Sequence, residues 1–254
     1  MHILPGLDDG ARTMEEAVEM ARVAAENGTK VLLATPHMRD VNERASVAQA
    51  RSVLDALARE AGRQGIPIEF AMGMETHVVP DLPGMFRRGQ ALPIGNTKYA
   101  LVEMPFFDKP AYLEDTLFAV QLQGVTPVLA HPERIECIQD DPKLLARFVE
   151  RGMLSQITGG SLLGHFGPEV KRFTEELLRR KLAHVMASDT HRPDGPRWPV
   201  LTQAVKAAAL IVGEAGARAL VVDTPKAILE GRPVEAAAPE GAPAVKRRWW
   251  RFGG

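Results

Sequence analysis

Cysteine is almost absent from this sequence: Cys137 is the only one among 254 residues. An intrachain disulfide is therefore excluded, and the scarcity of cysteine is typical of a reducing compartment. Chemistry based on a cysteine thiolate is disfavoured as well. A thiolate that attacks phosphorus is paired with an arginine in the pattern C-x5-R, whereas the sixth residue after Cys137 is Lys143 and no glycine lies between them. We predict that Cys137 has no catalytic role.

Long apolar runs and an excess of charge of one sign are also missing. No stretch approaches the roughly 18 consecutive apolar residues that span a bilayer, and no signal peptide precedes the first predicted element. Lysine plus arginine total 31 against 32 for aspartate plus glutamate, so the net charge is −1 and no overall field attracts nucleic acid. Neither a long basic stripe nor a G-x-G-x-x-G motif occurs in the segment expected to fold. The default expectation is a cytoplasmic protein that binds no nucleic acid.

What the sequence does contain is a regular alternation of helical and strand-like segments. Thr13 and Glu16 form a capping-box pattern, and apolar residues then recur at helical spacing until Gly28. Apolar strands that are each followed by a helix predict a parallel sheet covered on both faces. Counting the opening HIL, seven strands are expected, at residues 2–4, 30–35, 68–75, 99–104, 126–131, 154–158 and 184–188. Helices are expected near residues 13–28, 43–64, 112–123, 142–151, 169–181 and 198–216.

This pattern favours an α/β fold of the (β/α)-barrel type with a reduced number of strands, formed by one domain over residues 1–234. After Gly231 the composition changes to VEAAAPEGAPA and then to KRRWWRFGG. Residues 235–254 are therefore predicted to be a disordered tail. The basic and aromatic segment 246–252 is interpreted either as a solvated end or as a weak, salt-sensitive contact with an anionic membrane surface.

Histidines and carboxylates stand at the ends of the predicted strands. In a parallel barrel these ends gather at one mouth, where active sites form. Imidazole and carboxylate ligands together suit zinc, manganese or iron, and a set of seven exceeds the needs of one tetrahedral ion. Two or three ions that share carboxylates are expected, an arrangement that suits phosphoryl displacement. The predicted ligands are His2, His37, Glu75, Glu103, His131, Asp189 and His191.

Arginines and aspartates accompany these candidate ligands. Arg134, in HPER, and Arg197, in PRWP, carry guanidinium groups that can hold phosphate oxygens through paired hydrogen bonds, with a structural salt bridge as the alternative for Arg134. Asp8 and Asp9 form either a simple turn or a pair that orients ligand histidines, and we assign Asp9 to the catalytic residues. The remaining histidines are expected to be structural or solvent-exposed: His77, His165 and His184.

The same segments carry a resemblance to a known family. HILPGLDDG, ATPH, GMETHVVPDL, YALVEMP, PVLAHPER, QITGGSLLGHFG and ASDTH, taken together, resemble the PHP-domain protein-tyrosine phosphatases of bacterial capsule and exopolysaccharide loci, the CpsB/CapC type. The resemblance implies a distorted seven-stranded (β/α) barrel with a site for two to three metal ions. Manganese is the expected metal, with iron or zinc as alternatives. It also implies hydrolysis of phosphotyrosine on a partner protein, expected to be a membrane-bound bacterial tyrosine kinase that controls exopolysaccharide synthesis. By motif, the seven ligands and both arginines named above match the family's metal-binding and phosphate-binding residues.

The first motif departs from the family pattern. The family begins with His-x-His on its first strand, whereas here Met1 occupies the middle position and His2 that of the second histidine. As given, the chain is therefore expected to be one ligand short, through either a misplaced start site or a real truncation. Two alternative functions stay open: another PHP phosphoesterase, such as a histidinol-phosphatase-like enzyme, or a non-catalytic regulator with a damaged metal site.

Overall fold

The structure, a computed structural model, describes residues 1–234, and the segment predicted to contact membranes lies outside the described residues. Within residues 1–234, all the paired strands run parallel. They are β1 (Val31–Ala34), β2 (Glu69–Met72), β3 (Glu75–His77), β4 (Tyr99–Glu103), β5 (Thr126–Ala130), β6 (Leu154–Thr158) and β7 (Val185–Ala187).

The strands form two sheets that the chain joins into a ring. β1 pairs with β2, and the second sheet runs in the order β3-β4-β5-β6-β7. The predicted strand 68–75 is wrong as one element, because the chain changes partner at Gly73: β2 lies against β1, whereas β3 lies against β4. An isolated bridge between His37 and Glu75 continues the edge of β1 onto β3.

The opening HIL is not a strand, contrary to the prediction. The amide of Thr35 donates to the Met1 carbonyl and the amide of His2 donates to the Thr190 carbonyl, both at 2.9 Å. Pro5, which lacks an N–H, and Gly6, with a φ of 73°, then turn the chain before a ladder can form. The segment nevertheless closes the ring, because it is hydrogen-bonded between the end of β1 and the loop after β7.

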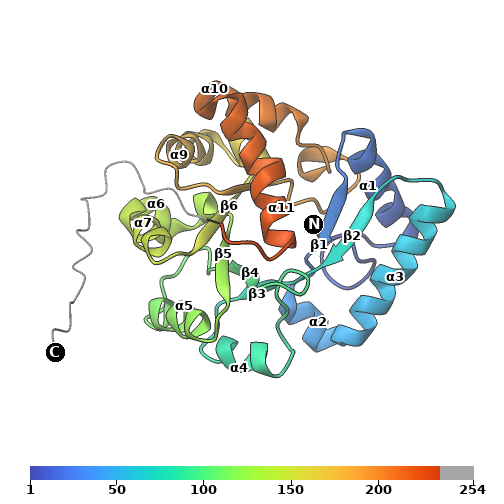
Figure 1. Cartoon of the computed structure of the whole chain (residues 1–254), viewed down its shortest axis with the longest axis horizontal. Helices are drawn as coiled ribbons and strands as arrows, with labels where there is room; N and C mark the ends of the chain where they lie inside the picture. Colours follow the sequence, from blue (N-terminus) through green and yellow to red (C-terminus); the bar gives the residue numbers. More distant parts are fainter. Residues whose placement is uncertain (235–254) are drawn as a thin grey trace, which may run out of the picture.

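Helices surround the ring of strands (Figure 1). The first begins as predicted, with the Thr13 side chain accepting from the Glu16 amide, but the Glu16 carboxylate accepts from the Arg12 amide and not from Thr13. The helix expected at 43–64 is interrupted at Ala45, and Ser46 caps its second part. The helices are α1 (Met14–Glu26), α2 (Met38–Arg44), α3 (Val47–Arg63), α4 (Leu82–Arg87), α5 (Leu113–Leu122), α6 (Glu136–Asp140), α7 (Pro142–Glu150), α8 (Gly159–Leu163), α9 (Pro168–Arg179), α10 (Thr202–Arg218) and α11 (Thr224–Leu229).

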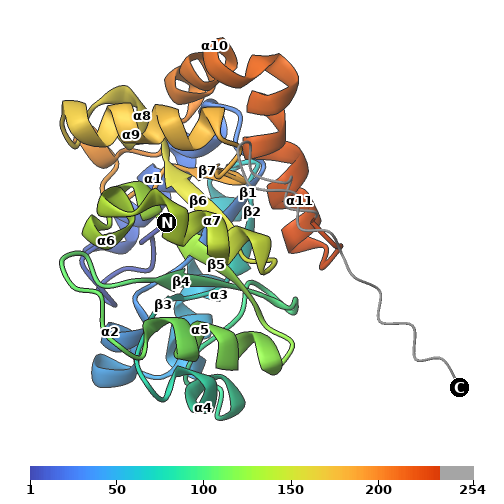
Figure 2. The ribbon, with the colours of Figure 1, turned by 90° about the vertical axis from the view of Figure 1, so that its left-hand side faces the viewer.

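Short helical turns connect several of these elements. α10 is kinked at Gly213, whose φ of 75° is outside the helical region. Seen from the side, α10 lies at the opposite end of the molecule from α2 and α4 (Figure 2). None of the helices in residues 1–234 is both long and apolar enough to cross a membrane. The turns are η1 (Pro132–Arg134), η2 (Gly195–Arg197) and η3 (Ala219–Asp223).

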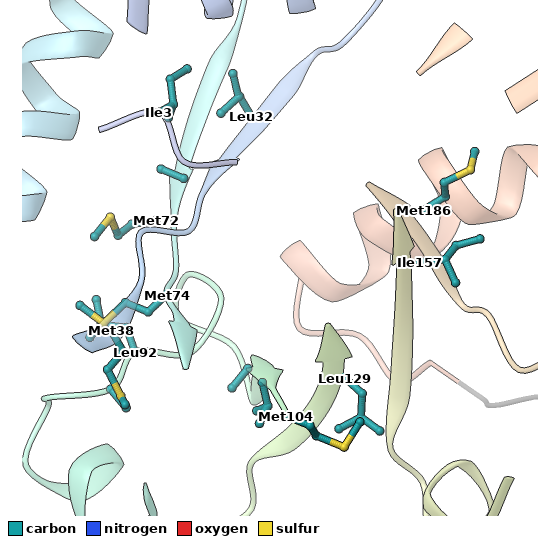
Figure 3. Packing of buried hydrophobic residues seen from close by; sticks show 14 of the residues in the cluster. Ile3, Leu32, Met38, Met72, Met74, Leu92, Met104, Leu129, Ile157 and Met186 are labelled. Carbon is teal, nitrogen blue, oxygen red and sulfur yellow. The ribbon is translucent and has the colours of Figure 1, made fainter. Parts of the chain in front are cut away.

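Buried apolar side chains fill the space inside and around the ring. Ile157 on β6 and Met186 on β7 are at most 2% exposed. Figure 3 shows Met38, Met74 and Leu92 gathered where β2 bends into β3. Methionine is flexible enough to fill such an irregular space. The apolar interior fixes the strands, and it leaves the strand ends as the place where polar side chains can collect.

Candidate metal centre

The side chains predicted from the strand ends come together in one cavity of about 790 Å³. His2 and Asp189 do not line it but are buried against its wall, with His2 Nε2 3.3 Å from Glu75 Oε2 and 3.6 Å from Asp189 Oδ1. The structure thus brings every predicted site residue to one place. The predicted residues that line the cavity are Asp9, His37, Glu75, Glu103, His131, Arg134, His191 and Arg197.

The ends of β5 and β7 carry unusual backbone angles. His131 follows β5 with a φ of 32°, and Asp189 lies just after β7 with a φ of 50°, so both are in the left-handed region although neither is glycine. Such conformations are strained, and they persist where the surrounding structure imposes them, often at functional sites. At both strand ends the strained turn leaves a buried polar side chain in the mouth of the ring.

Glu75 is the central carboxylate of the cluster. Its Oε1 lies 3.1 Å from His131 Nε2, whereas its Oε2 lies 3.3 Å from His2 Nε2 and 3.3 Å from His37 Nδ1. The two oxygens therefore face different histidines on different elements. A carboxylate in this position is suited to bridge two ions.

Asp8 helps to position two of the histidines, through the His2 side chain and the His37 backbone amide. Its Oδ2 lies 2.7 Å from His2 Nδ1 and accepts from the His37 amide at 3.2 Å. Because a carboxylate only accepts, Nδ1 of His2 carries a proton, and the ring is held so that Nε2 faces Glu75 and Asp189. Gly10 completes this turn, since a Cβ there would overlap the His2 carbonyl. Of the two interpretations of the aspartate pair, the structure supports orientation of a histidine by Asp8.

Asp9 takes a different position from Asp8. Its carboxylate is well exposed to the cavity, with Oδ1 3.3 Å from His191 Nε2 and 3.5 Å from His37 Nε2. Hydrogen bonds with His191 and His37 hold the pKa of Asp9 far below its usual value, so it is ionised. The structure therefore places this predicted catalytic residue among possible metal ligands.

The two arginines meet on one carboxylate. Arg197 donates to Asp189 Oδ2 at 2.7 Å, and Arg134 donates to the same oxygen at 3.1 Å. The guanidinium carbon of Arg134 lies 5.0 Å from the ring centre of Phe106 and 4.4 Å from that of Phe166. Both contacts are within the range of cation–π attraction, which fixes the plane of the guanidinium group.

The charges of the cluster are set by competition between burial and neighbouring groups. Burial lowers the pKa of His131, but Glu103 and Glu75 outweigh it and raise that pKa to about 10. Burial raises the pKa of Glu103, but His131 and His77 outweigh it and lower that pKa to about 2. The pKa of Glu75 is held well below its usual value by His131 and His2 in the same way. The cluster therefore consists of ionised carboxylates that require positive partners.

The donor set fits divalent transition-metal ions. Buried polar atoms normally have hydrogen-bond partners, yet Nδ1 of His131 has none. Mixed imidazole and carboxylate donors suit zinc, manganese or iron. Two groups of predicted site residues each place one ligand atom per residue within 4.8 Å of the others in the same group. The first group is His2, Asp9, His37 and His191, and the second is Glu75, Glu103 and His131.

Sequence reasoning missed one histidine at this site. His77, expected to be structural or exposed, lines the cavity with Nε2 2.8 Å from Glu103 Oε2. Its position on β3, two residues after Glu75, was the available signal, because alternate residues of a strand share a face. As expected, His165 is exposed, and His184 is buried away from the cavity, just before β7.

Comparison with known proteins places this arrangement in a family. Residues 1–230 match the family described as capsular polysaccharide synthesis, CpsB/CapC. The tyrosine-protein phosphatase YwqE of Bacillus subtilis is 39% identical over 190 residues, which cover 75% of each chain. The tyrosine-protein phosphatase CpsB of Streptococcus agalactiae is 26% identical over 234 residues, covering 90% of this chain and 96% of the relative.

The fold has a close counterpart among solved structures. The work on YwqE from Bacillus subtilis and CpsB from Streptococcus pneumoniae, described as unique metal-dependent tyrosine phosphatases, includes a chain that superposes with a TM-score of 0.86. That chain is 34% identical, and the match covers 94% of this chain and 96% of the other. This likeness confirms the predicted distorted barrel of the PHP type. Together with the match over residues 1–230, it establishes that the chain belongs to the CpsB/CapC family.

Proposed function

We propose that this chain is a metal-dependent protein-tyrosine phosphatase, a phosphoric monoester hydrolase whose site is the cavity described above. The observation that carries the proposal is the juxtaposition of ionised carboxylates and histidines with two arginines in a single cavity. The names of the relatives support the same reaction. The catalytic domain extends over residues 1–234 and acts in the cytoplasm.

Two to three divalent ions, manganese in the first instance and iron or zinc otherwise, are held by the predicted ligands. His2, Asp9, His37 and His191 would hold one ion, and Glu75, Glu103 and His131 would hold another, with Asp189 beside His2. When bound, such ions lower the pKa of a water molecule and neutralise phosphoryl oxygens. The chain itself orients His2 through Asp8 and keeps the carboxylates ionised.

The two arginines bind the phosphoryl group. Each guanidinium already donates to Asp189 at the edge of the cavity, so both are desolvated in part and point toward the same place. A phosphate offers more acceptor oxygens than one carboxylate and allows paired hydrogen bonds with both arginines. The apolar wall beside them accommodates the aromatic ring of phosphotyrosine; it includes Val79, Met104, Pro105 and Phe106.

The partner is a phosphotyrosine protein, and we propose a membrane-bound bacterial tyrosine kinase that controls exopolysaccharide synthesis. The basic and aromatic segment 246–252 supplies a weak, reversible contact with the same anionic membrane surface. Co-sedimentation with anionic liposomes at low salt tests this contact. Full-length protein is expected to pellet more than a form ending at Val234, and equal pelleting would refute the contact.

Substrate comparison with purified protein tests the proposed function. We expect hydrolysis of a phosphotyrosine peptide with manganese, arrest by a chelator, and no loss of activity in Cys137→Ser. Faster hydrolysis of histidinol phosphate would instead assign the alternative phosphoesterase. Metal binding that falls short of stoichiometric, without turnover on either substrate, would identify a non-catalytic regulator.

A further inference from the structure

His77 lines the cavity, but the proposed reaction does not use its side chain. Glu75 and His77 lie on the same face of β3, because side chains alternate along a strand. The strand therefore extends the cluster by one imidazole beyond the predicted ligands. The His77 side chain lines the cavity and is about one-third exposed, so an ion can reach it from solvent.

His77 lies against two residues with metal-ligand chemistry. Its Nε2 is 2.8 Å from Glu103 Oε2, and its ring centre is 5.4 Å from that of His37. His37, His77 and Glu103 place one ligand atom each within 4.8 Å of one another. The Nδ1 atom of His77 is buried and has no hydrogen-bond partner, whereas Nδ1 of His37 lies 3.3 Å from Glu75 Oε2. An unpaired buried atom of this kind is rare in proteins and points to a missing ligand at His77.

The chemistry of this set selects a class of ion. Two neutral imidazoles and one carboxylate, with the remaining position open to water in the cavity, form a coordination set that suits zinc. The hard cations magnesium and calcium prefer sets made only of oxygen atoms and are disfavoured here.

Two of the three residues in this set also belong to the neighbouring groups. His37 also belongs to the group of His2, Asp9 and His191, and Glu103 also belongs to the group of Glu75 and His131. A neutral imidazole has one lone pair for coordination and therefore serves one ion at a time. An ion held by His37 and His77 consequently withdraws His37 from the first group.

We infer that His37, His77 and Glu103 form an additional zinc site whose occupation competes with the metal centre. Zinc in excess fills this site, removes His37 from the catalytic arrangement and inhibits the enzyme. The inhibition rests on the proposed function, whereas the binding site does not. A measurement of zinc stoichiometry therefore separates failure of this inference from failure of the proposed function.

Equilibrium dialysis against zinc tests the site without any turnover. His77→Ala is expected to bind one zinc fewer than the unmodified chain at high zinc, and His165→Ala, at an exposed histidine outside the cavity, is expected to bind as many as the unmodified chain. His77→Cys is the sharper variant, because a thiolate is a strong zinc ligand and restores the lost equivalent. A histidine that only held Glu103 in place would not be replaced by cysteine.

Inhibition provides the second measurement. The zinc concentration that halves manganese-dependent turnover is expected to rise about tenfold or more in His77→Ala, the scale seen when a metal site loses support. This half-inhibitory zinc concentration should return to the value of the unmodified chain in His77→Cys and stay at that value in His165→Ala. Equal zinc stoichiometry in the unmodified chain and His77→Ala would overturn the inference. Loss of all bound zinc in His77→Ala would overturn it too, since His77 would then support the main centre.

Discussion

Two buried histidines lie in very different surroundings. His131 follows β5 at the mouth of the ring, and His184 precedes β7 at the other end; they are 2% and 8% exposed. Burial lowers the pKa of both. Glu103 and Glu75 reverse this effect at His131 and raise its pKa to about 10, whereas nothing reverses it at His184, whose pKa falls to about 4.

The hydrogen bonds of the two side chains explain the difference. His131 Nε2 lies 3.1 Å from Glu75 Oε1 and 3.2 Å from Glu103 Oε1, so it faces two ionised groups. His184 Nδ1 accepts a hydrogen bond from the Ser155 amide at 3.1 Å, so this nitrogen carries no proton and the ring is neutral. Burial alone does not identify a functional histidine; the charge of its neighbours does.

The largest effect is expected from removing the negative charge at the mouth. Glu75→Gln keeps the size of the side chain but deprives His131, His2 and His37 of their shared carboxylate. Metal content and turnover should fall together, by at least about 100-fold in affinity for the ions. Atomic spectroscopy of the purified protein and peptide hydrolysis measure both. Glu114→Gln, a matched change on α5 outside the cavity, should alter neither, and full metal content in Glu75→Gln would contradict the assignment.

Arg134→Ala should lower the activity of this site without removing its metal ions. The guanidinium contacts Asp189 but is not itself a ligand, so metal content should remain while kcat/KM falls. Removal of one preorganised donor costs about 2–4 kcal/mol of transition-state stabilisation. Paired measurements of metal content and kcat/KM test the assignment. Loss of metal along with activity would show that Arg134 supports the centre instead of binding phosphate.

His184 should make folding sensitive to acid at the other end of the ring. Its folded-state pKa of about 4 lies below the usual 6.5, so the neutral form is favoured in the folded protein. The free energy of unfolding should therefore fall as the pH drops from about 6.5 toward 4, by about 3 kcal/mol in total. Denaturant unfolding at several pH values, on protein from which metal has been removed with a chelator, measures this pH dependence.

The control for this pH effect removes the titrating ring. His184→Asn retains an acceptor for the Ser155 amide but cannot be protonated. The difference in stability between the unmodified chain and this variant should shrink as the pH falls through that window. A constant difference would mean that His184 does not titrate there. The pH dependence of stability that His131 contributes has the opposite sign. Its raised pKa stabilises the folded, metal-free protein below pH 6.5, and this stabilisation is lost as the pH rises toward 10.

The site at the mouth of the ring was predictable from sequence because most of the predicted apolar strands end in, or are followed by, a histidine or a carboxylate. Glu103 ends β4 and His131 follows β5, and parallel strands bring such residues together without further information. The break between β2 and β3 was not predictable, because Gly73 marks a change of strand partner that depends on the rest of the ring. His77 was not predicted because the expected strand ended at Glu75, whereas β3 begins there and continues to His77.

Contacts between distant loops were beyond prediction from sequence for a related reason. Phe106 follows β4 and Phe166 follows α8, and no sequence pattern in either segment predicts that both lie against Arg134. Their meeting depends on the closure of the ring. The same holds for the separation of the two aspartates, since Asp8 and Asp9 are adjacent in sequence but only the fold turns one toward His2 and the other toward His191.

The smallest effect is expected at Phe166, which contacts the guanidinium group of Arg134 but does not line the cavity. Phe166→Ala removes one of the two rings beside the guanidinium, 4.4 Å away, and should lower kcat/KM by about 1 kcal/mol, roughly fivefold. Phe166→Trp retains an aromatic face and should recover most of the loss. Phe118→Ala is the matched control, because Phe118 is 51% exposed on α5 and lies outside the cavity. Combined with Arg134→Ala, the change at Phe166 should have no further effect. Additive losses in the double variant would show that Phe166 acts on the substrate directly and not through the arginine.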